Sequence, residues 1–459
     1  MSAPTERTDI KIQRERAVLA AVHLPESRFD PRDPLGELRA LAETAGTRVV
    51  GEVTQNRDRP EAGTYMGKGK IEELKGMCEE LNAGVVIFDH ELSPKQIGSI
   101  EEIVGRKVLD RSELILDIFA SRATTKQARL QVEIAQLEYT YPRLRAMWDH
   151  LERIVGSGGI GGVGTRGPGE QQLEIDRRIV QRRKAMLKRE LEEVQARKTR
   201  EVRSRNASHF TVGLVGYTNA GKSTLFNVLT EGGAYANDQL FATLLTRTRE
   251  WRLSAGDARG MEVMLSDTVG FIRSLPHHLV GSFRATLEEA THADLLLLVL
   301  DVSDPNADLA YETVTDTLND IFEDTRRIEE RACFEWTPPE TLLLLNKVDL
   351  LRDNASLLVW ERRDPDAIPI SAARPDEPWR AELEARVRQA ARGTIEEWAI
   401  TLPMSDGKAV HNAEQWGEVL DRAYDNGSVT LRARLGERDV ARLRALSREL
   451  HAERVHAGA

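Results

Sequence analysis

The sequence predicts an α/β multidomain protein whose central domain is a mostly parallel sheet with helices on both faces. The 459 residues exceed one ordinary core, because a domain usually holds about 150 residues. A strand-like run at 210–215 leads directly into a glycine-containing loop at 216–223 and then into a helical stretch. Further apolar runs end in polar residues, as parallel strands do at the ligand-binding edge of such a sheet.

The composition is that of a globular protein, with 41% hydrophobic and 30% charged residues, and it excludes collagen-like architecture and global disorder. The longest apolar runs, 295–300 and 342–345, fall far short of the about 18 residues that a spanning helix needs. The N-terminal residues lack the pattern of an export signal. Two distant cysteines, Cys78 and Cys333, fit neither a disulfide frame nor a zinc site. We therefore expect a protein of the reducing cytoplasm with no insertion into a membrane. Nothing in the sequence demands a dimer, so a monomer is expected.

Residues 1–122 are expected to form an N-terminal α/β domain, because short apolar runs at 47–53 and 84–89 alternate with helical charge patterns. Between those runs, a glycine-containing turn at 65–70 enters a helix. Its backbone N–H groups and Lys68 or Lys70 could bind a phosphate. A plain turn with solvated lysines explains the same pattern at least as well.

Residues 123–207 are expected to form a helical hairpin. An apolar stripe from Leu130 to Tyr141 predicts the first helix, and a second helix follows from 170 to about 204. The segment 156–169 between them holds 8 glycines in 14 residues, which rules out a regular helix there. The hairpin therefore has a glycine-rich tip.

The second arm of the hairpin is strongly basic in an acidic chain. Residues 177–205 hold 12 Lys or Arg against 4 Glu, whereas the whole chain carries a net charge of −10. Such a run is either a solvated face of a coiled-coil arm or a surface that neutralises RNA phosphates. On the second interpretation, the candidate RNA contacts are Arg166, Arg177, Arg178, Arg182, Arg183 and Lys184.

The loop of the central domain, expected at 208–395, is a full G-x-x-x-x-G-K-S motif from Gly216 to Ser223. In this motif the backbone amides surround the phosphates, Lys222 reaches the β- and γ-phosphates, and the Ser223 hydroxyl binds Mg²⁺. The run at 261–266 then ends in Asp267-Thr-Val-Gly270. Asp267 can hold Mg²⁺, and the Gly270 amide can contact the γ-phosphate.

A third motif reads the base. The run at 341–345 ends in Asn346-Lys-Val-Asp349, and the Asp349 carboxylate accepts hydrogen bonds from a donor pair that guanine offers and adenine does not. Asn346 supports the N7 side of the base, and Lys347 packs along it. Residues 371–373 place backbone N–H groups near the guanine O6. These motifs stand in the order of a GTP-binding domain, with a switch threonine to be chosen among Thr243, Thr246 and Thr248.

Together, GYTNAGKSTLFN, DQLFATL, DTVGFIRSLPHHLVGSFRATLEE, NKVD and TRGPGEQQLEIDRR resemble the HflX-type GTPases, ribosome-associated relatives of the Obg group. The resemblance covers about residues 45–375. It selects Thr243 as the switch threonine, although Leu245-Thr-Arg-Thr stands where the family usually has Asp-Pro-Thr. It implies a Mg²⁺-dependent GTPase that binds the large ribosomal subunit and splits or rescues idle or stalled ribosomes, with ATP as a further ligand of the N-terminal domain.

The expected site comprises catalytic, metal-binding and GTP-binding residues. The catalytic residues are Lys222, Thr243 and Gly270, and the metal ligands are Ser223, Thr243 and Asp267. The GTP-binding residues are Gly216, Tyr217, Thr218, Asn219, Ala220, Gly221, Lys222, Ser223, Thr224, Phe241, Ala242, Thr243, Leu244, Leu245, Asp267, Thr268, Val269, Gly270, Asn346, Lys347, Val348, Asp349, Ser371, Ala372 and Ala373.

No water-orienting residue follows Gly270, because Phe271 is apolar. Ribosomal contact could supply the missing arrangement, or Asn219 could help to hold a K⁺. Two other functions stay open: a nucleotide-gated switch that acts on a protein partner, and an ATP-dependent RNA remodeller driven by the N-terminal domain.

Residues 396–459 are expected to form a small α+β domain. An alternating pattern at 427–435 predicts one strand, and a basic helix is expected at 438–454.

Overall fold

The computed structural model describes residues 15–139 except 28, then 141, 168–206, 209–230, 247–253, 261–273, 290–331 and 336–455 except 426 and 448. Within the helix at 168–206, side chains are described from 177 to 197. The described residues divide into two compact units, 15–194 and those from 195 onward, and each is described by itself. None of the described helices has the length and apolar character to cross a membrane.

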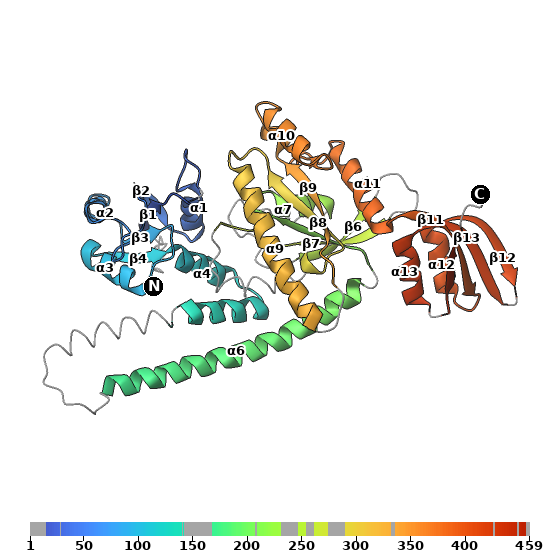
Figure 1. The fold of residues 1–459 in the computed structure, drawn as a ribbon, viewed down its shortest axis with the longest axis horizontal. Coiled ribbons are helices and arrows are strands. Elements are labelled where there is room, and N and C mark those ends of the chain that lie inside the picture. Colours follow the sequence, from blue (N-terminus) through green and yellow to red (C-terminus); the bar gives the residue numbers. More distant parts are fainter. Residues whose placement is uncertain are drawn as a thin grey trace, which may run out of the picture. The chain divides into compact units, whose positions relative to one another are not determined.

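The N-terminal domain is a parallel sheet of four strands in the order β2-β1-β3-β4 (Figure 1). Its elements are β1 (Arg16–His23), α1 (Gly36–Thr44), β2 (Arg48–Asn56), α2 (Lys68–Glu80), β3 (Val85–Phe88), α3 (Pro94–Val104), β4 (Lys107–Asp110) and α4 (Arg111–Arg122). Consecutive residues of β1 from Ala17 to Val22 are fully buried, so both faces of the sheet are covered, as in doubly wound folds. The predicted α/β domain is therefore observed.

The contacts of the turn with Lys68 and Lys70 favour a plain turn over an anion-binding site. The Lys70 ammonium lies 2.8 Å from the Glu73 carboxylate. The Gly67 N–H, just before α2, donates to Gln55 Oε1 at 2.8 Å. Both groups therefore already have partners within the domain.

The two arms of the hairpin, a helix at 126–139 and α6 (Pro168–Asn206), pack through a small apolar cluster. Leu130 and Ile134 contact Leu187 in that cluster. The Tyr139 hydroxyl donates to Asp110 Oδ1 at 2.6 Å, which attaches the first arm to the N-terminal domain. The predicted stripe thus packs as expected.

The central sheet has six strands in the order β10-β9-β8-β5-β7-β6, and only β6 runs antiparallel to its neighbour. Its elements are β5 (Thr211–Gly216), α7 (Lys222–Leu229), β6 (Arg247–Leu253), β7 (Met261–Asp267), β8 (Leu295–Asp301), α9 (Ala307–Arg331), β9 (Glu340–Asn346), the 3-10 turn η1 (Val348–Leu350), α10 (Ala355–Arg363), β10 (Ile368–Pro369) and α11 (Trp379–Arg392). This arrangement confirms the predicted fold class.

The C-terminal domain is an antiparallel sheet in the order β12-β13-β11-β14 with two helices on one face (Figure 1). Its elements are β11 (Ile395–Pro403), α12 (Gly407–Trp416), β12 (Glu418–Asp425), β13 (Ser428–Gly436), α13 (Glu437–Leu446) and β14 (His451–Arg454). This β-α-β-β-α-β order is the ferredoxin-like arrangement. The predicted strand corresponds to β13. The predicted helix at 438–454 is confirmed as α13 up to Leu446, but the prediction is wrong beyond that residue. The helix ends at Leu446, because the residues after it pair with β11 instead.

The connection between the central and C-terminal domains is tight. Gly393 ends α11 with φ +68°, a conformation that favours glycine. A Cβ on Gly436 would lie 1.9 Å from the Arg392 carbonyl oxygen. The Arg438 guanidinium donates to the Ala390 carbonyl at 3.0 Å and lies over the Phe210 ring. The two domains therefore share backbone and side-chain contacts at this point.

Candidate nucleotide-binding site

The predicted motifs meet at one edge of the central sheet. Because β5, β7, β8 and β9 are parallel, their carboxyl ends share that edge. These ends carry Gly216, Asp267, Asp301 and Asn346. Asp301 and Asn346 are direct partners in the strand register. The fold thus gathers three polar strand ends and the start of the glycine-containing loop from distant parts of the chain.

The loop after β5 has a backbone that requires glycine at two positions. Gly221 has φ +95°, and a Cβ there would lie 2.2 Å from Asn346 Nδ2. Gly216 has φ +152°, and its Cβ would lie 2.3 Å from the Val299 carbonyl oxygen. Helix α7 begins immediately afterwards, so its first N–H groups face the loop, the arrangement that binds phosphate.

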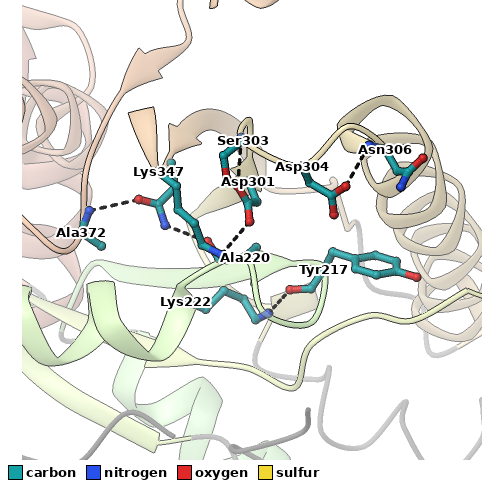
Figure 2. A network of polar contacts seen from close by, with 10 residues as sticks. Tyr217, Ala220, Lys222, Asp301, Ser303, Asp304, Asn306, Lys347 and Ala372 are labelled. Atoms are coloured by element: carbon teal, nitrogen blue, oxygen red, sulfur yellow. Dashed lines mark hydrogen bonds and ion pairs between the residues drawn. The ribbon is translucent and has the colours of Figure 1, made fainter. Parts of the chain in front are cut away.

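Lys222 is folded onto the loop that precedes it. Its ammonium donates to the carbonyl oxygens of Gly216 at 3.0 Å and Tyr217 at 2.6 Å, and Figure 2 shows the bond to Tyr217. The side chain is 6% exposed. Burial lowers the pKa of Lys222 to about 8, although the nearby Asp267 carboxylate opposes this shift. The loop therefore holds a desolvated cation beside the first N–H groups of α7.

Ser223 and Asp267 lie together, as expected of two metal ligands. The Ser223 hydroxyl donates to Asp267 Oδ2 at 3.0 Å, and Asp267 is 1% exposed. A hydroxyl and a carboxylate are hard oxygen ligands, which suit Mg²⁺ held by one or two protein groups together with phosphates. The described residues contain no cluster of three acidic, His or Cys side chains, so an all-protein metal cage is absent from that part of the chain. The residues fit Mg²⁺ bound jointly with a nucleotide.

The segment after Asp267 is bonded to the phosphate loop. The Thr218 N–H donates to the Phe271 carbonyl at 2.8 Å, and the Phe271 N–H donates to the Gly216 carbonyl at 3.1 Å. A Cβ on Gly270 would lie 2.9 Å from both Lys222 Nζ and Thr218 Cα. Only glycine brings the backbone so close to the lysine. Phe271 is 3% exposed and has no polar group with which to orient water.

The base-reading loops are linked by side-chain bonds. Asn346 donates from Nδ2 to the Ala220 carbonyl at 2.7 Å and accepts from the Ala372 N–H at 3.0 Å. The Asp349 carboxylate accepts from the Ser371 hydroxyl at 2.7 Å. Asn346 thus connects the phosphate loop with the loop at 371–373, a positioning role that the sequence alone did not indicate.

Asp301 is a further site residue, and its role was not predicted. Its Oδ2 pairs with the Lys347 ammonium at 2.6 Å, while its Oδ1 accepts from the Ser303 hydroxyl at 2.6 Å (Figure 2). Lys347 has φ +65°, so the pair holds a strained backbone in place. The signal was present in the sequence, because Asp301 ends the apolar run 295–300.

The described part of the expected site is gathered at this edge. It comprises Gly216, Tyr217, Thr218, Asn219, Ala220, Gly221, Lys222, Ser223, Thr224, Asp267, Thr268, Val269, Gly270, Asn346, Lys347, Val348, Asp349, Ser371, Ala372 and Ala373. Phe241, Ala242, Thr243, Leu244 and Leu245 lie outside the described residues, as does Arg166.

The candidate RNA contacts on α6 fall into two groups. Arg183 and Lys184 pair with Glu133 and Glu138 of the first arm, at 2.6 and 2.7 Å. Arg177, Arg178 and Arg182 are exposed. The first group therefore joins the two arms of the hairpin, and the second group extends the exposed basic surface, to which Arg183 also belongs.

A phosphate loop, a switch aspartate and a guanine-reading loop on one mostly parallel sheet define the central domain as a P-loop GTPase. The chain matches three family models in succession, described as "GTP-binding GTPase N-terminal" over 32–120, "GTP-binding GTPase Middle Region" over 122–205 and "50S ribosome-binding GTPase" over 211–347. Relatives named GTPase HflX are 38–46% identical to this chain over 69–94% of its length, so the chain belongs to the HflX family of GTPases.

Individual relatives support this assignment along most of the chain. The GTPase HflX of Escherichia coli K12 is 38% identical over 433 residues, covering 94% of this chain and 95% of the relative. That of Alkalihalophilus pseudofirmus is 39% identical over 413 residues, covering 90% and 91%. That of Lacrimispora saccharolytica is 46% identical over 318 residues, covering 69% and 73%.

Proposed function

We propose that this GTPase uses Mg²⁺ to hydrolyse GTP in the cytoplasm, associates with the large ribosomal subunit, and splits or rescues idle or stalled ribosomes. The main support is the edge of the central sheet where the carboxyl ends of the parallel strands meet. Asp267 and Asn346 end two of these strands, and Lys222 begins the helix that follows the loop after β5. The description of the model matched over 211–347, a 50S ribosome-binding GTPase, supports the ribosomal partner. The exposed arginines of α6 offer a surface for RNA phosphates.

Catalysis in this proposal is mainly positioning and charge neutralisation. The Lys222 ammonium exchanges the carbonyls of Gly216 and Tyr217 for the β- and γ-phosphates. Ser223 and Asp267 hold Mg²⁺, which neutralises charge on the phosphates when bound. The Gly270 N–H donates to the γ-phosphate, and Asp349 selects guanine. Thr243 completes the set as the switch threonine.

We expect association with large subunits to depend on the nucleotide. Co-sedimentation with purified subunits is compared for GDP and a non-hydrolysable GTP analogue, with GTP turnover followed in parallel. Because the γ-phosphate orders the residues that contact it, binding should be tight only with the analogue, and subunits should accelerate turnover. No binding with either nucleotide would contradict the ribosomal role and favour a switch that acts on a protein partner. Equal binding with both nucleotides would contradict the expected dependence on the γ-phosphate.

The same assay tests the exposed arginines of α6. Replacing Arg177, Arg178 and Arg182 with Ala should weaken association and reduce the slope of its salt dependence by about two to three, since each phosphate contact contributes about 0.7 to 0.9. The matched control replaces three exposed arginines of the second unit, Arg326, Arg327 and Arg352. An equal loss in the two variants would assign the effect to net charge alone.

We expect intrinsic turnover to be slow in NaCl and faster in KCl. We propose that Asn219, which is exposed and has φ +64°, helps to hold a K⁺ that supplements the charge near the phosphates. Exchange of Na⁺ for K⁺ should raise kcat by on the order of tenfold or more, the effect of one added contact to developing charge. Asn219→Ala should lose this response. A high rate in NaCl without ribosomes would contradict both the K⁺ and the ribosomal route of activation.

A further inference from the structure

The phosphate loop and the segment after β7 are joined by one side chain as well as by backbone. Tyr217 and Phe271 form an isolated parallel bridge, made by the two N–H bonds of Thr218 and Phe271 described above. Two residues further along, the Arg273 N–H donates to the Tyr217 hydroxyl at 2.9 Å. The hydroxyl therefore extends the attachment beyond the reach of the backbone bridge.

These bonds hold the residues that directly follow Gly270. Gly270 lies between Asp267, the last residue of β7, and the bridge at Phe271. Its backbone is close enough to the loop that a Cβ would meet Thr218 and Lys222. A displacement of 271–273 would therefore be transmitted to the Gly270 amide, because neighbouring Cα atoms are fixed about 3.8 Å apart across a planar peptide bond.

We infer that Tyr217 is a positioning residue for GTP hydrolysis, whose hydroxyl holds the backbone that carries the Gly270 N–H against the phosphate loop. This inference rests on the proposed contact between that N–H and the γ-phosphate. The backbone bridge can form with almost any residue at 217, whereas the bond to Arg273 needs a hydroxyl at the end of a long, rigid side chain. Tyrosine supplies both length and acceptor, and phenylalanine supplies only length.

The inference predicts a selective effect of Tyr217→Phe. The ring volume is kept, so the half-buried position remains filled. The Arg273 N–H loses its partner, and the Gly270 amide is held less firmly. Since GDP has no γ-phosphate, its affinity should be unchanged, whereas kcat for GTP should fall between about two- and tenfold, the range of one neutral hydrogen bond.

Three measurements on the full-length protein test this. Single-turnover GTP hydrolysis and equilibrium binding of fluorescent GDP are compared in the wild type, Tyr217→Phe and the control Tyr424→Phe, which removes a hydroxyl from a 64% exposed side chain in the C-terminal domain. Amide hydrogen exchange at Arg273 reports the bond itself. We expect faster exchange and lower kcat in Tyr217→Phe alone, with GDP affinity as in the wild type.

The outcomes separate this inference from the proposed function. Unchanged or raised kcat, unchanged exchange at Arg273, or an equal loss of GDP and GTP affinity would each overturn the role of the hydroxyl. A wild type that binds GDP but does not hydrolyse GTP, with or without ribosomal subunits, would instead overturn the proposed function. A fall in thermal stability of Tyr217→Phe that matched its loss of activity would show that the hydroxyl acts only on the fold.

Discussion

Lys222→Ala should lower kcat/KM for GTP by about 10²- to 10³-fold, the cost of one charge contact to the transition state, and leave the fold intact. The lysine is the buried cation of the phosphate loop, and its present partners are two backbone carbonyls that a phosphate can replace. Hydrolysis and GDP binding are measured beside the control Lys408→Ala, an exposed lysine of α12. Hydrolysis at the wild-type rate would assign the activity elsewhere, with the N-terminal domain as the first alternative.

Lys222→Ala should also change how the free energy of unfolding depends on pH. Burial lowers the pKa of Lys222 to about 8 from 10.5, so between these values the unfolded chain binds a proton that the folded chain releases. The free energy of unfolding of the nucleotide-free protein should therefore rise with pH across this window, by about 3 kcal/mol in total. The rise should be smaller by that amount in Lys222→Ala, as measured by urea unfolding from pH 7.5 to pH 10.5. Identical pH dependence in the two proteins would show that the lysine is not desolvated.

Asp349→Asn should exchange the base preference from guanine to xanthine. The amide nitrogen of asparagine offers a donor where the carboxylate offered an acceptor, and xanthine presents an oxygen where guanine presents its amino group. The guanine site then holds unpaired donors, so GTP affinity should fall by about 10⁴-fold. The Ser371 hydroxyl still has an oxygen acceptor at position 349, which preserves the loop.

Competition between GTP and XTP for the variant measures this exchange. The control Asp376→Asn removes the charge of an exposed aspartate in the neighbouring loop. That control should bind GTP as the wild type does. Unchanged GTP affinity in Asp349→Asn would remove this carboxylate from the base-reading role.

The nucleotide site could be predicted largely from the sequence because its chemistry depends on strand ends. A polar residue after an apolar run, such as Asp267 or Asn346, is placed at the functional edge once the strands are parallel. Asp301 obeys the same rule but belongs to no named motif. Its pairing with Lys347 depends on the register of β8 and β9, which places Asp301 beside Asn346. Tyr217 occupies a variable position of the phosphate-loop motif, where the pattern assigns no role to the side chain.

The C-terminal domain shows where local patterns fail. The charge pattern of 438–454 continues without interruption, which favours one helix. The structure ends the helix at Leu446, because β14 pairs with β11, with Trp398 opposite Arg454. Strand β12 is almost entirely exposed, so it lacks the alternation that marks a half-buried strand. Strand β14 is specified by a partner distant in sequence, β11, and a local pattern does not contain that information. Strand β12 pairs with its neighbour β13, but its exposure leaves no alternation for a local pattern to detect.

The contacts at the end of α11 bear on how shortened forms of this protein behave. Phe210 precedes β5, is 1% exposed and lies under the Arg438 guanidinium. The Arg392 carbonyl packs against Gly436. A truncation that ends at 395 would strip this cover from the strand that leads into the phosphate loop. Weak nucleotide binding by such a fragment would then reflect an exposed hydrophobic edge, and aggregation would accompany it. Intact chains with point substitutions are the sounder way to separate the roles of the two domains.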